Sequence, residues 1–275
     1  MSSPIKPDQL NFPRASPQAA KVLAYLSAED PDMNEVNSII MQDPVLAGTL
    51  LRYANSPLYW RGGEISNVPA ATRMIGIKNV RSAVVMTTLR ATCPAESELT
   101  KTILQHSLGI ATLCKLIAKK SCPAVADDLE LLGLIHDIGM VVLACNVEDE
   151  YRALLMRARA ENIAIDVLEK MEFGFTHDQI AAKALHEFRL PKRHENVLTH
   201  FHQLPDENET DDELKKERAV LILAHRLLFD MHGGDACTET LFESTDELMQ
   251  TLNLDEGALG AIREQAQAHF SDFTG

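Results

Sequence analysis

The chain has 275 residues, of which 45% are hydrophobic, and its 40 acidic and 26 basic side chains give a formal net charge of −14. This length can bury a large core and lies between one domain and two, so two subdomains are expected. An acidic chain repels nucleic-acid phosphates and anionic lipids, so neither nucleic acid nor a membrane surface is an expected partner. The low aromatic share of 5%, beside abundant Ala, Leu and Met, favours helix.

Cysteines and the chain start indicate the compartment. The five cysteines are odd in number, scattered and never spaced as Cys-x-x-Cys, so neither a disulfide framework nor a thiolate zinc site is predicted. The first residues hold no apolar stretch of signal-peptide length, and the longest apolar region, 131–145, is interrupted by His136 and Asp137. We therefore expect a cytoplasmic protein without a membrane span.

Apolar residues recur at spacings of three and four along almost the whole chain, whereas the alternation of a strand is hard to find. The pattern predicts an all-α protein of about twelve helices. Several predicted helix starts carry a capping side chain with an acid or amide three residues later. These pairs are Asp32 with Glu35, Thr176 with Gln179, Thr210 with Glu213, and Ser244 with Glu247.

Two polar breaks divide the chain. The segment 92–97 contains proline and small polar residues and predicts the subdomain junction, and the acidic stretch 204–213 predicts a mobile surface loop. We expect an N-terminal helical subdomain over residues 1–95, a helical bundle over 96–235, and C-terminal helices over 236–275 packed on the body. A dimer surface is the alternative for these last helices, whose apolar anchors are Leu248, Leu252, Leu259 and Ile262.

The N-terminal half predicts short helices separated by proline and glycine. Two of them meet at Asp43-Pro44, because proline can begin the second helix but cannot continue the first. A further helix within 65–80 stops at Gly76. Asp43, Asn55 and Ser56 are explained as caps and turn formers. No titratable cluster lies in this half, so it is expected to hold no catalytic group, while a partner-binding surface stays open.

Three motifs in this half resemble the HDOD domain, a module of bacterial signalling proteins. They are QDPVL at 42–46, ANSP at 54–57 and Ile75-Gly76, and the resemblance extends over roughly residues 10–230. It implies an HDOD fold, in which the N-terminal helical subdomain is joined to an HD-type helical bundle.

The adjacent pair His136 and Asp137 is the strongest candidate for a functional site. It lies within the apolar run 129–145, which we expect to form one helix through the core, where such a pair is costly unless it is satisfied. Adjacent helical positions lie about 100° apart, so both side chains can lean toward the face of Gly133 and Met140. An imidazole and a carboxylate there can hold a divalent metal ion, with Gly133 leaving room beside it.

Further histidines fall at positions compatible with the same core. Several imidazoles and a carboxylate from separate helices are what a mononuclear or dinuclear site that activates water requires, although a hydrogen-bonded core role explains any single histidine. These candidates are His106 on an apolar helical stripe, His177 after the Thr176 cap, His225 on the face of Leu221 and Leu228, and His200 and His202 around Phe201. By contrast, His186, His194 and His232 are expected to face solvent.

The order of these histidines resembles the HD superfamily of metal-dependent phosphohydrolases, and the segment 175–191 resembles the stretch that carries the next family histidine. The resemblance implies a divalent metal, Fe, Mn, Zn or Mg, with ligands among His106, His136, Asp137, His177, His200, His202 and His225. Met140 stands where such hydrolases often have lysine. Their later His-His pair corresponds here to Phe201-His202 or to the spaced His200 and His202. His225 replaces the final aspartate, and the Gly-Tyr-Pro motif of the cyclic-dinucleotide branch is missing from the sequence.

These departures favour a regulatory interaction module of bacterial signal transduction with a degenerate metal centre. Its expected partner is a signalling protein or a small phosphorylated ligand. The alternative is a metal-dependent phosphohydrolase acting on a nucleotide or phosphate ester, and a third hypothesis is a purely structural helical scaffold. The sequence assigns no catalytic residue and predicts no organic cofactor.

Overall fold

The computed structural model describes residues 6–28, 30–56, 58–59, 62–92, 97–187, 192–200, 211–232 and 244–271. Every regular element in these ranges is helical, so the prediction of an all-α protein is confirmed. Fifteen α-helices and two short 3-10 helices lie in the described ranges, more than expected, partly because one predicted helix is divided in two. None of the helices in these ranges is long and apolar enough to cross a membrane.

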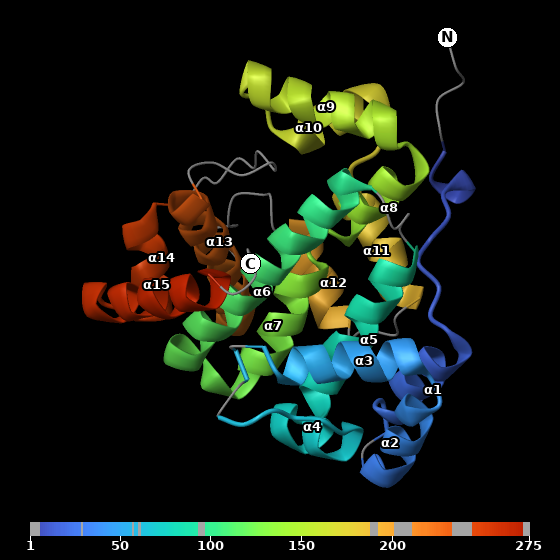
Figure 1. Cartoon of the computed structure of the whole chain (residues 1–275). Coiled ribbons are helices and arrows are strands. Elements are labelled where there is room, and N and C mark those ends of the chain that lie inside the picture. Colours follow the sequence, from blue (N-terminus) through green and yellow to red (C-terminus); the bar gives the residue numbers. More distant parts are fainter. Residues whose placement is uncertain are drawn as a thin grey trace.

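The helices between residues 17 and 75 gather in the lower part of Figure 1. Asp43 accepts hydrogen bonds from the backbone amides of Val45 and Leu46 and so begins one helix where the previous one has ended. Gly76 ends another with a φ of 80°, a conformation that favours glycine. The elements are η1 (Pro7–Gln9), α1 (Pro17–Tyr25), α2 (Met33–Met41), α3 (Pro44–Ala54), α4 (Val68–Ile75) and α5 (Ile77–Thr92).

A long central helix organises the rest of the molecule. Helix α6 (Glu98–Ser121) runs through the middle of Figure 1 and is followed by η2 (Pro123–Val125) and by α7 (Ala126–Ile135), with which it packs extensively. Helix α8 (Ile138–Asn146) continues the apolar run after a break at His136 and Asp137. The prediction of one continuous helix over 129–145 is therefore wrong.

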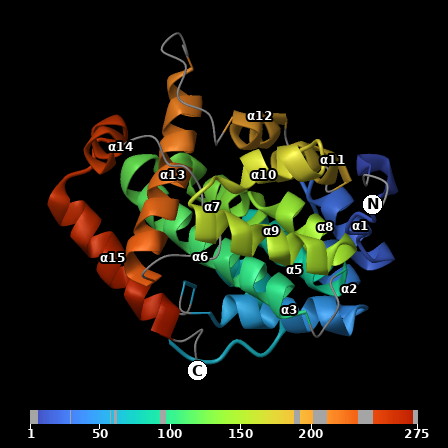
Figure 2. The ribbon, with the colours of Figure 1, turned by 90° about the horizontal axis from the view of Figure 1, so that it is seen from above.

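The remaining helices cover this centre. Helix α11 packs on α8, and α13 packs on α6 and α14. Figures 1 and 2 both place α14 and α15 at the end of the molecule away from α1 and α2. The elements are α9 (Glu148–Glu161), α10 (Ile165–Glu172), α11 (His177–Glu187), α12 (Lys192–His200), α13 (Asp212–His232), α14 (Thr245–Leu252) and α15 (Glu256–Ser271).

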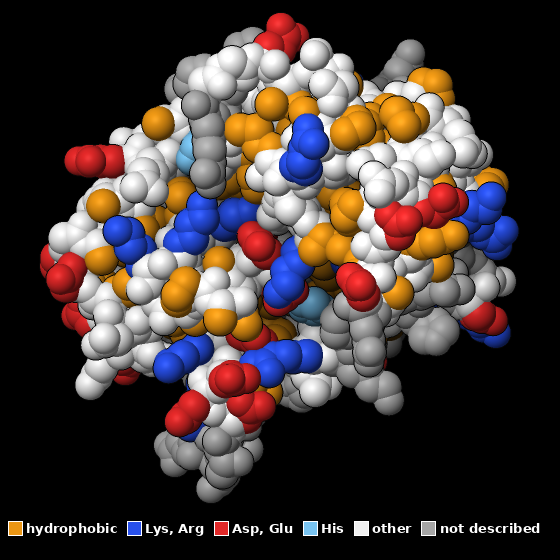
Figure 3. Space-filling view, turned by 90° about the horizontal axis from the view of Figure 1, so that it is seen from below, with side chains coloured by type: hydrophobic (Ala, Val, Ile, Leu, Met, Phe, Trp, Pro, Cys, Tyr) orange, Lys and Arg blue, Asp and Glu red, His pale blue; other side chains and the backbone are white. Residues whose placement is uncertain are grey.

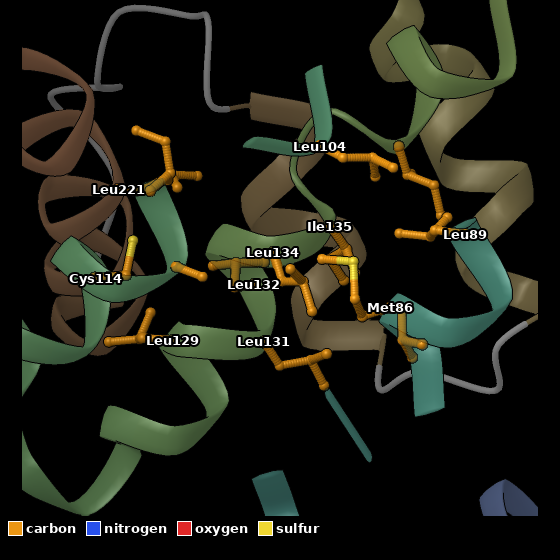
Figure 4. Packing of buried hydrophobic residues seen from close by; sticks show 14 of the residues in the cluster. Met86, Leu89, Leu104, Cys114, Leu129, Leu131, Leu132, Leu134, Ile135 and Leu221 are labelled. Atoms are coloured by element: carbon orange, nitrogen blue, oxygen red, sulfur yellow. The ribbon is translucent and has the colours of Figure 1, made fainter. Parts of the chain in front are cut away.

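The core is built from the apolar faces of α5, α6, α7 and α13. Figure 4 shows Met86, Leu104, Ile135 and Leu221 among the side chains that fill it. The two C-terminal helices are amphipathic and packed on the body through their predicted anchors, all of which are buried: Leu248, Leu252, Leu259 and Ile262.

The predicted helix starts at Asp32, Thr176 and Ser244 are confirmed, whereas α13 begins after Asp211, which accepts from two backbone amides one residue later than the predicted cap Thr210. Asp32 caps α2, Thr176 and Gln179 exchange hydrogen bonds at the start of α11, and Ser244 forms a capping box with Glu247. Helix α5 ends and α6 begins on either side of residues 93–96, which lie outside the described residues, as do Thr210 and most of the predicted loop at 204–213. The domain boundaries at 95 and 235 stay predictions.

Candidate metal centre

Three imidazoles from different helices meet in the core. They belong to His106 on α6, His136 at the break between α7 and α8, and His225 on α13. One ring nitrogen of each lies within 4.8 Å of a ring nitrogen of the other two, and the ring centroids are 4.7 to 5.3 Å apart. All three side chains are buried. Three converging imidazoles form a donor set that suits zinc and other divalent transition metals.

The carboxylate of Asp137 lies against two of these rings. Its Oδ2 is 3.1 Å from Nε2 of His136 and 3.6 Å from Nε2 of His106. The side chain is fully buried, and neither oxygen accepts a hydrogen bond. Burial raises the pKa of this carboxyl, but the neighbouring imidazoles of His136, His106 and His177 outweigh burial and hold the pKa well below its usual range. A buried carboxylate without hydrogen bonds fits a bound cation.

The break between α7 and α8 orients His136. Its Nδ1 lies 2.7 Å from the carbonyl oxygen of Gly133, and because a carbonyl can only accept, Nδ1 carries the proton. When that ring is neutral, Nε2 keeps its lone pair toward Asp137 and the other rings, which is the tautomer that a metal ligand needs. His136 and Asp137 thus converge at a corner of the backbone, and not along one helix face as the sequence predicted.

Two glycines let neighbouring helices approach this corner. A Cβ on Gly133 would lie 2.9 Å from the Cα of Ala111, so the prediction that Gly133 leaves room for a metal is wrong, because α6 occupies that space. A Cβ on Gly139 would lie 1.9 Å from the carbonyl oxygen of His177, which no side-chain movement can relieve. Gly139 therefore permits the first turn of α11 to pack directly on α8.

His177 is held beside the three-imidazole group and not within it. Its Nδ1 lies 2.7 Å from Oε2 of Glu169, a fully buried carboxylate that also accepts from the Tyr151 hydroxyl at 2.6 Å and from the His177 backbone amide at 2.7 Å. Burial lowers the pKa of His177, but Glu169 and Asp178 raise it well above its ordinary value. Sequence reasoning missed Glu169, although a glutamate on the apolar side of an amphipathic helix is a signal of such a role.

The structure describes only some of the remaining histidines that the sequence analysis considered. His202 and the side chains of His200, His186 and His232 lie outside. His194 is only 8% exposed, so the prediction that it faces solvent is wrong. Met140 is completely buried. Of the predicted ligands that the structure describes, it brings together His106, His136, Asp137 and His225, with His177 beside them.

A second buried polar cluster joins the N-terminal helices to the bundle, and the sequence did not reveal it. Glu130 on α7 lies 2.5 Å from the ammonium group of Lys115 on α6 and accepts hydrogen bonds from the hydroxyls of Tyr53 and Tyr59. Burial raises the pKa of both tyrosines, so their hydroxyls stay protonated and donate. The available signal was a single charged residue within an apolar stretch of each helix, Lys115 within residues 110–118 and Glu130 within residues 129–135.

The comparisons with known proteins agree with this architecture. The family model of the HDOD domain matches residues 12–204. No curated protein matches the chain.

Three solved bacterial structures are similar to the chain. An HDOD domain protein of unknown function from Geobacter sulfurreducens is 20% identical, with a TM-score of 0.71 over 97% of this chain and 90% of that one. A "Putative phosphohydrolase" from Shewanella amazonensis is also 20% identical, with a TM-score of 0.71 over 96% and 92%. A "Putative signal transduction protein" from Marinobacter aquaeolei is 19% identical, with a TM-score of 0.72 over 96% of this chain and 58% of that one.

At these identities the structural likeness establishes the fold alone. The family model, in contrast, covers well over half of the sequence and includes the three N-terminal motifs, both His136 and Asp137, and His177. The chain therefore belongs to the HDOD family.

Proposed function

We propose that this HDOD protein is a regulatory module of bacterial signal transduction that acts in the cytoplasm through a signalling partner, and that its histidine cluster holds a divalent metal ion as a structural centre. The burial of the cluster carries this proposal. Asp137 is fully buried, His136 is 2% exposed, and His106 and His225 are 7% and 5% exposed. A phosphate ester cannot reach ligands so deep in the core without displacing packed helices.

His106, His136, His225 and Asp137 would hold the ion, with His177 and Glu169 supporting the site. When bound, a divalent ion crosslinks helices and can also act as a Lewis acid. The positions of the chain's own residues favour the role of crosslinking helices. Three imidazoles from α6, α13 and the α7–α8 corner converge, so an ion there would tie the corner to two helices that flank it.

The surroundings of the cluster give little support for phosphate chemistry. Met140, at the position where the resemblance places a lysine, is buried and uncharged, so it cannot neutralise a phosphate. Lys115, a buried lysine of the bundle, is paired with Glu130 and Asp127 in the second polar cluster. A regulatory role needs neither substrate access nor a phosphate-binding cation.

Metal analysis of protein purified without chelator tests the proposal. We expect close to stoichiometric divalent metal in the parent and in His194→Gln, which replaces a buried histidine outside the cluster. His136→Gln should lose the metal, and chelation should lower the melting temperatures of the parent and of His194→Gln but not that of His136→Gln. A parent protein without metal would remove the structural centre from the proposal.

A metal-dependent phosphohydrolase is the second candidate, favoured by the convergence of three imidazoles with a carboxylate. The parent protein loaded with Mn²⁺, Fe²⁺ or Zn²⁺ would be incubated with bis-p-nitrophenyl phosphate and with a nucleoside monophosphate. Turnover that disappears in Asp137→Asn while the variant remains folded would establish hydrolysis and reject the regulatory proposal. We expect no turnover above that of Asp137→Asn.

A further inference from the structure

A small cavity lies where the N-terminal helices meet the bundle, apart from the histidine cluster. Its volume is about 250 Å³, and it is lined by residues of α3, α5, α6 and α7. Apolar side chains form much of its wall, and hydroxyl and charged groups complete it. The apolar lining residues are Leu58, Met86, Leu108 and Ala111, and the polar ones are Thr49, Arg52, Tyr53, Ser56, Arg90, Thr112 and Glu130.

Two guanidinium groups belong to this lining. Arg52 comes from α3 and Arg90 from α5, and both side chains are exposed. Nη2 of Arg52 donates to the hydroxyl of Thr49 at 3.0 Å, which holds the guanidinium against the cavity wall. Within the described residues, no acidic side chain forms a salt bridge with either arginine. Partial desolvation of the guanidinium lowers the pKa of Arg90, and the nearby charge of Arg52 lowers it further, as expected for two cations on one cavity.

The only acidic group in the lining, Glu130, does not offset these charges. It is paired with Lys115 at 2.5 Å and accepts from two tyrosine hydroxyls, so its charge is already compensated. The cavity therefore presents a net positive charge on a chain whose formal charge is −14. Guanidinium groups bind carboxylates and phosphates through paired hydrogen bonds, and such charge-assisted bonds are the strong ones.

We propose that this cavity binds a small organic anion, with Arg52 and Arg90 on its carboxylate or phosphate group and Met86, Leu108 and Ala111 against its apolar body. The volume sets the size of the ligand. A cavity of about 150 Å³ accepts benzene, so 250 Å³ suits one aromatic ring or a short aliphatic chain with a single anionic head. The cavity shares no residue with the histidine cluster, so the outcome of its test does not depend on the proposed function.

Isothermal titration calorimetry at low salt tests the site by measuring the affinity of four small ligands, two with both a ring and an anionic group and two with only one of these groups. Phenyl phosphate and benzoate carry both a ring and an anion, and they distinguish a phosphate head from a carboxylate head. Inorganic phosphate carries only the charge, and benzyl alcohol carries only the ring. We expect phenyl phosphate or benzoate to bind at least roughly tenfold more tightly than either partial probe, because both halves of the cavity are used.

Variants place the binding in the cavity. Arg52→Gln and Arg90→Gln should each weaken binding roughly tenfold or more, and the double variant should abolish it. Arg73→Gln, on an exposed arginine of α4 outside the cavity, is the matched control and should bind as the parent does. Leu58→Trp fills the cavity while keeping both charges and should also abolish binding.

Two results would overturn the proposal. One is unchanged binding in the double arginine variant or in Leu58→Trp, since the anion would then lie elsewhere or on the outer surface. The other is a lack of saturable binding for both ring-bearing anions up to roughly 10 mM, which is weaker than a built site of two arginines provides.

Discussion

Lys115 and Glu130 form an ion pair of 2.5 Å in which the lysine side chain is 4% exposed and the glutamate side chain is not exposed at all. Their partners come from both parts of the chain, since Tyr53, Tyr59 and Asn79 precede α6 and Asp127 lies on α7. The pair therefore ties the N-terminal helices to the bundle.

Removing one partner of this pair should strongly destabilise the fold. Lys115→Met leaves Glu130 as a buried charge without its cation, and we expect a loss of about 3–5 kcal/mol in the free energy of unfolding measured by urea. Lys78→Met is the control, because the Lys78–Asp128 pair is 48% and 39% exposed and should contribute about 0–1 kcal/mol. Equal effects of the two substitutions would show that burial of the Lys115 pair does not matter.

Gly139→Ala should destabilise the protein and weaken metal binding together. The added Cβ would meet the His177 carbonyl at 1.9 Å, so α11 must move away from α8, and we expect a cost of about 2–4 kcal/mol by analogy with overpacked cores. Gly260→Ala on α15 has no neighbour within 4 Å of the new Cβ and should stabilise the helix by up to about 1 kcal/mol. Urea unfolding and metal content measure both effects, and an unaffected Gly139→Ala protein would contradict the close approach.

The buried His194 should make stability depend on pH in the acid range. Burial lowers the pKa of this imidazole below its ordinary 6.5, so the unfolded chain binds the proton more readily than the folded chain does. The contribution of the neutral ring is therefore complete above about pH 6.5 and is lost as the pH falls from there toward the lower folded pKa.

The difference between parent and His194→Gln isolates this group. We expect unfolding free energies of the two proteins, measured between about pH 7.5 and 5, to converge as the pH falls. A difference that stays constant or grows on acidification would show that His194 is not held neutral in the fold.

Asp43→Ala should remove a helix cap. Asp43 accepts from the amides of Val45 and Leu46 at 3.0 and 3.1 Å and from the hydroxyl of Ser16 at 3.0 Å. We expect a loss of about 1 kcal/mol in thermal unfolding experiments, most of it recovered by Asp43→Asn, which keeps a capping oxygen. If alanine and asparagine were equally harmful, the charge and not the cap would be the feature that matters.

The sequence predicted several helix starts and one helix end correctly. Asp32, Asp43 and Ser244 begin helices because their side chains satisfy nearby amides, and Gly76 ends one because the backbone needs a positive φ. These signals lie within a few residues of the boundary they set. The family resemblance added the fold and the identity of the clustered histidines.

Tertiary relationships were harder to predict. The pairing of Lys115 with Glu130 depends on how α6 and α7 lie against each other, which a single sequence does not reveal. His194 was expected in solvent because its neighbours in sequence are charged, but the packing of α12 buries it. The break at His136 was missed because the run is apolar on both sides, so periodicity gave no sign of an end.

The break between α7 and α8 has a consequence for how the neighbouring helices pack. The apolar segment is interrupted at His136 and Asp137, and both of its parts contact α6, while the second part also packs on α11. The interruption separates a part that packs on α5 and α13 from a part that packs on α9 and α11, and it places the two polar side chains between these two groups of neighbours.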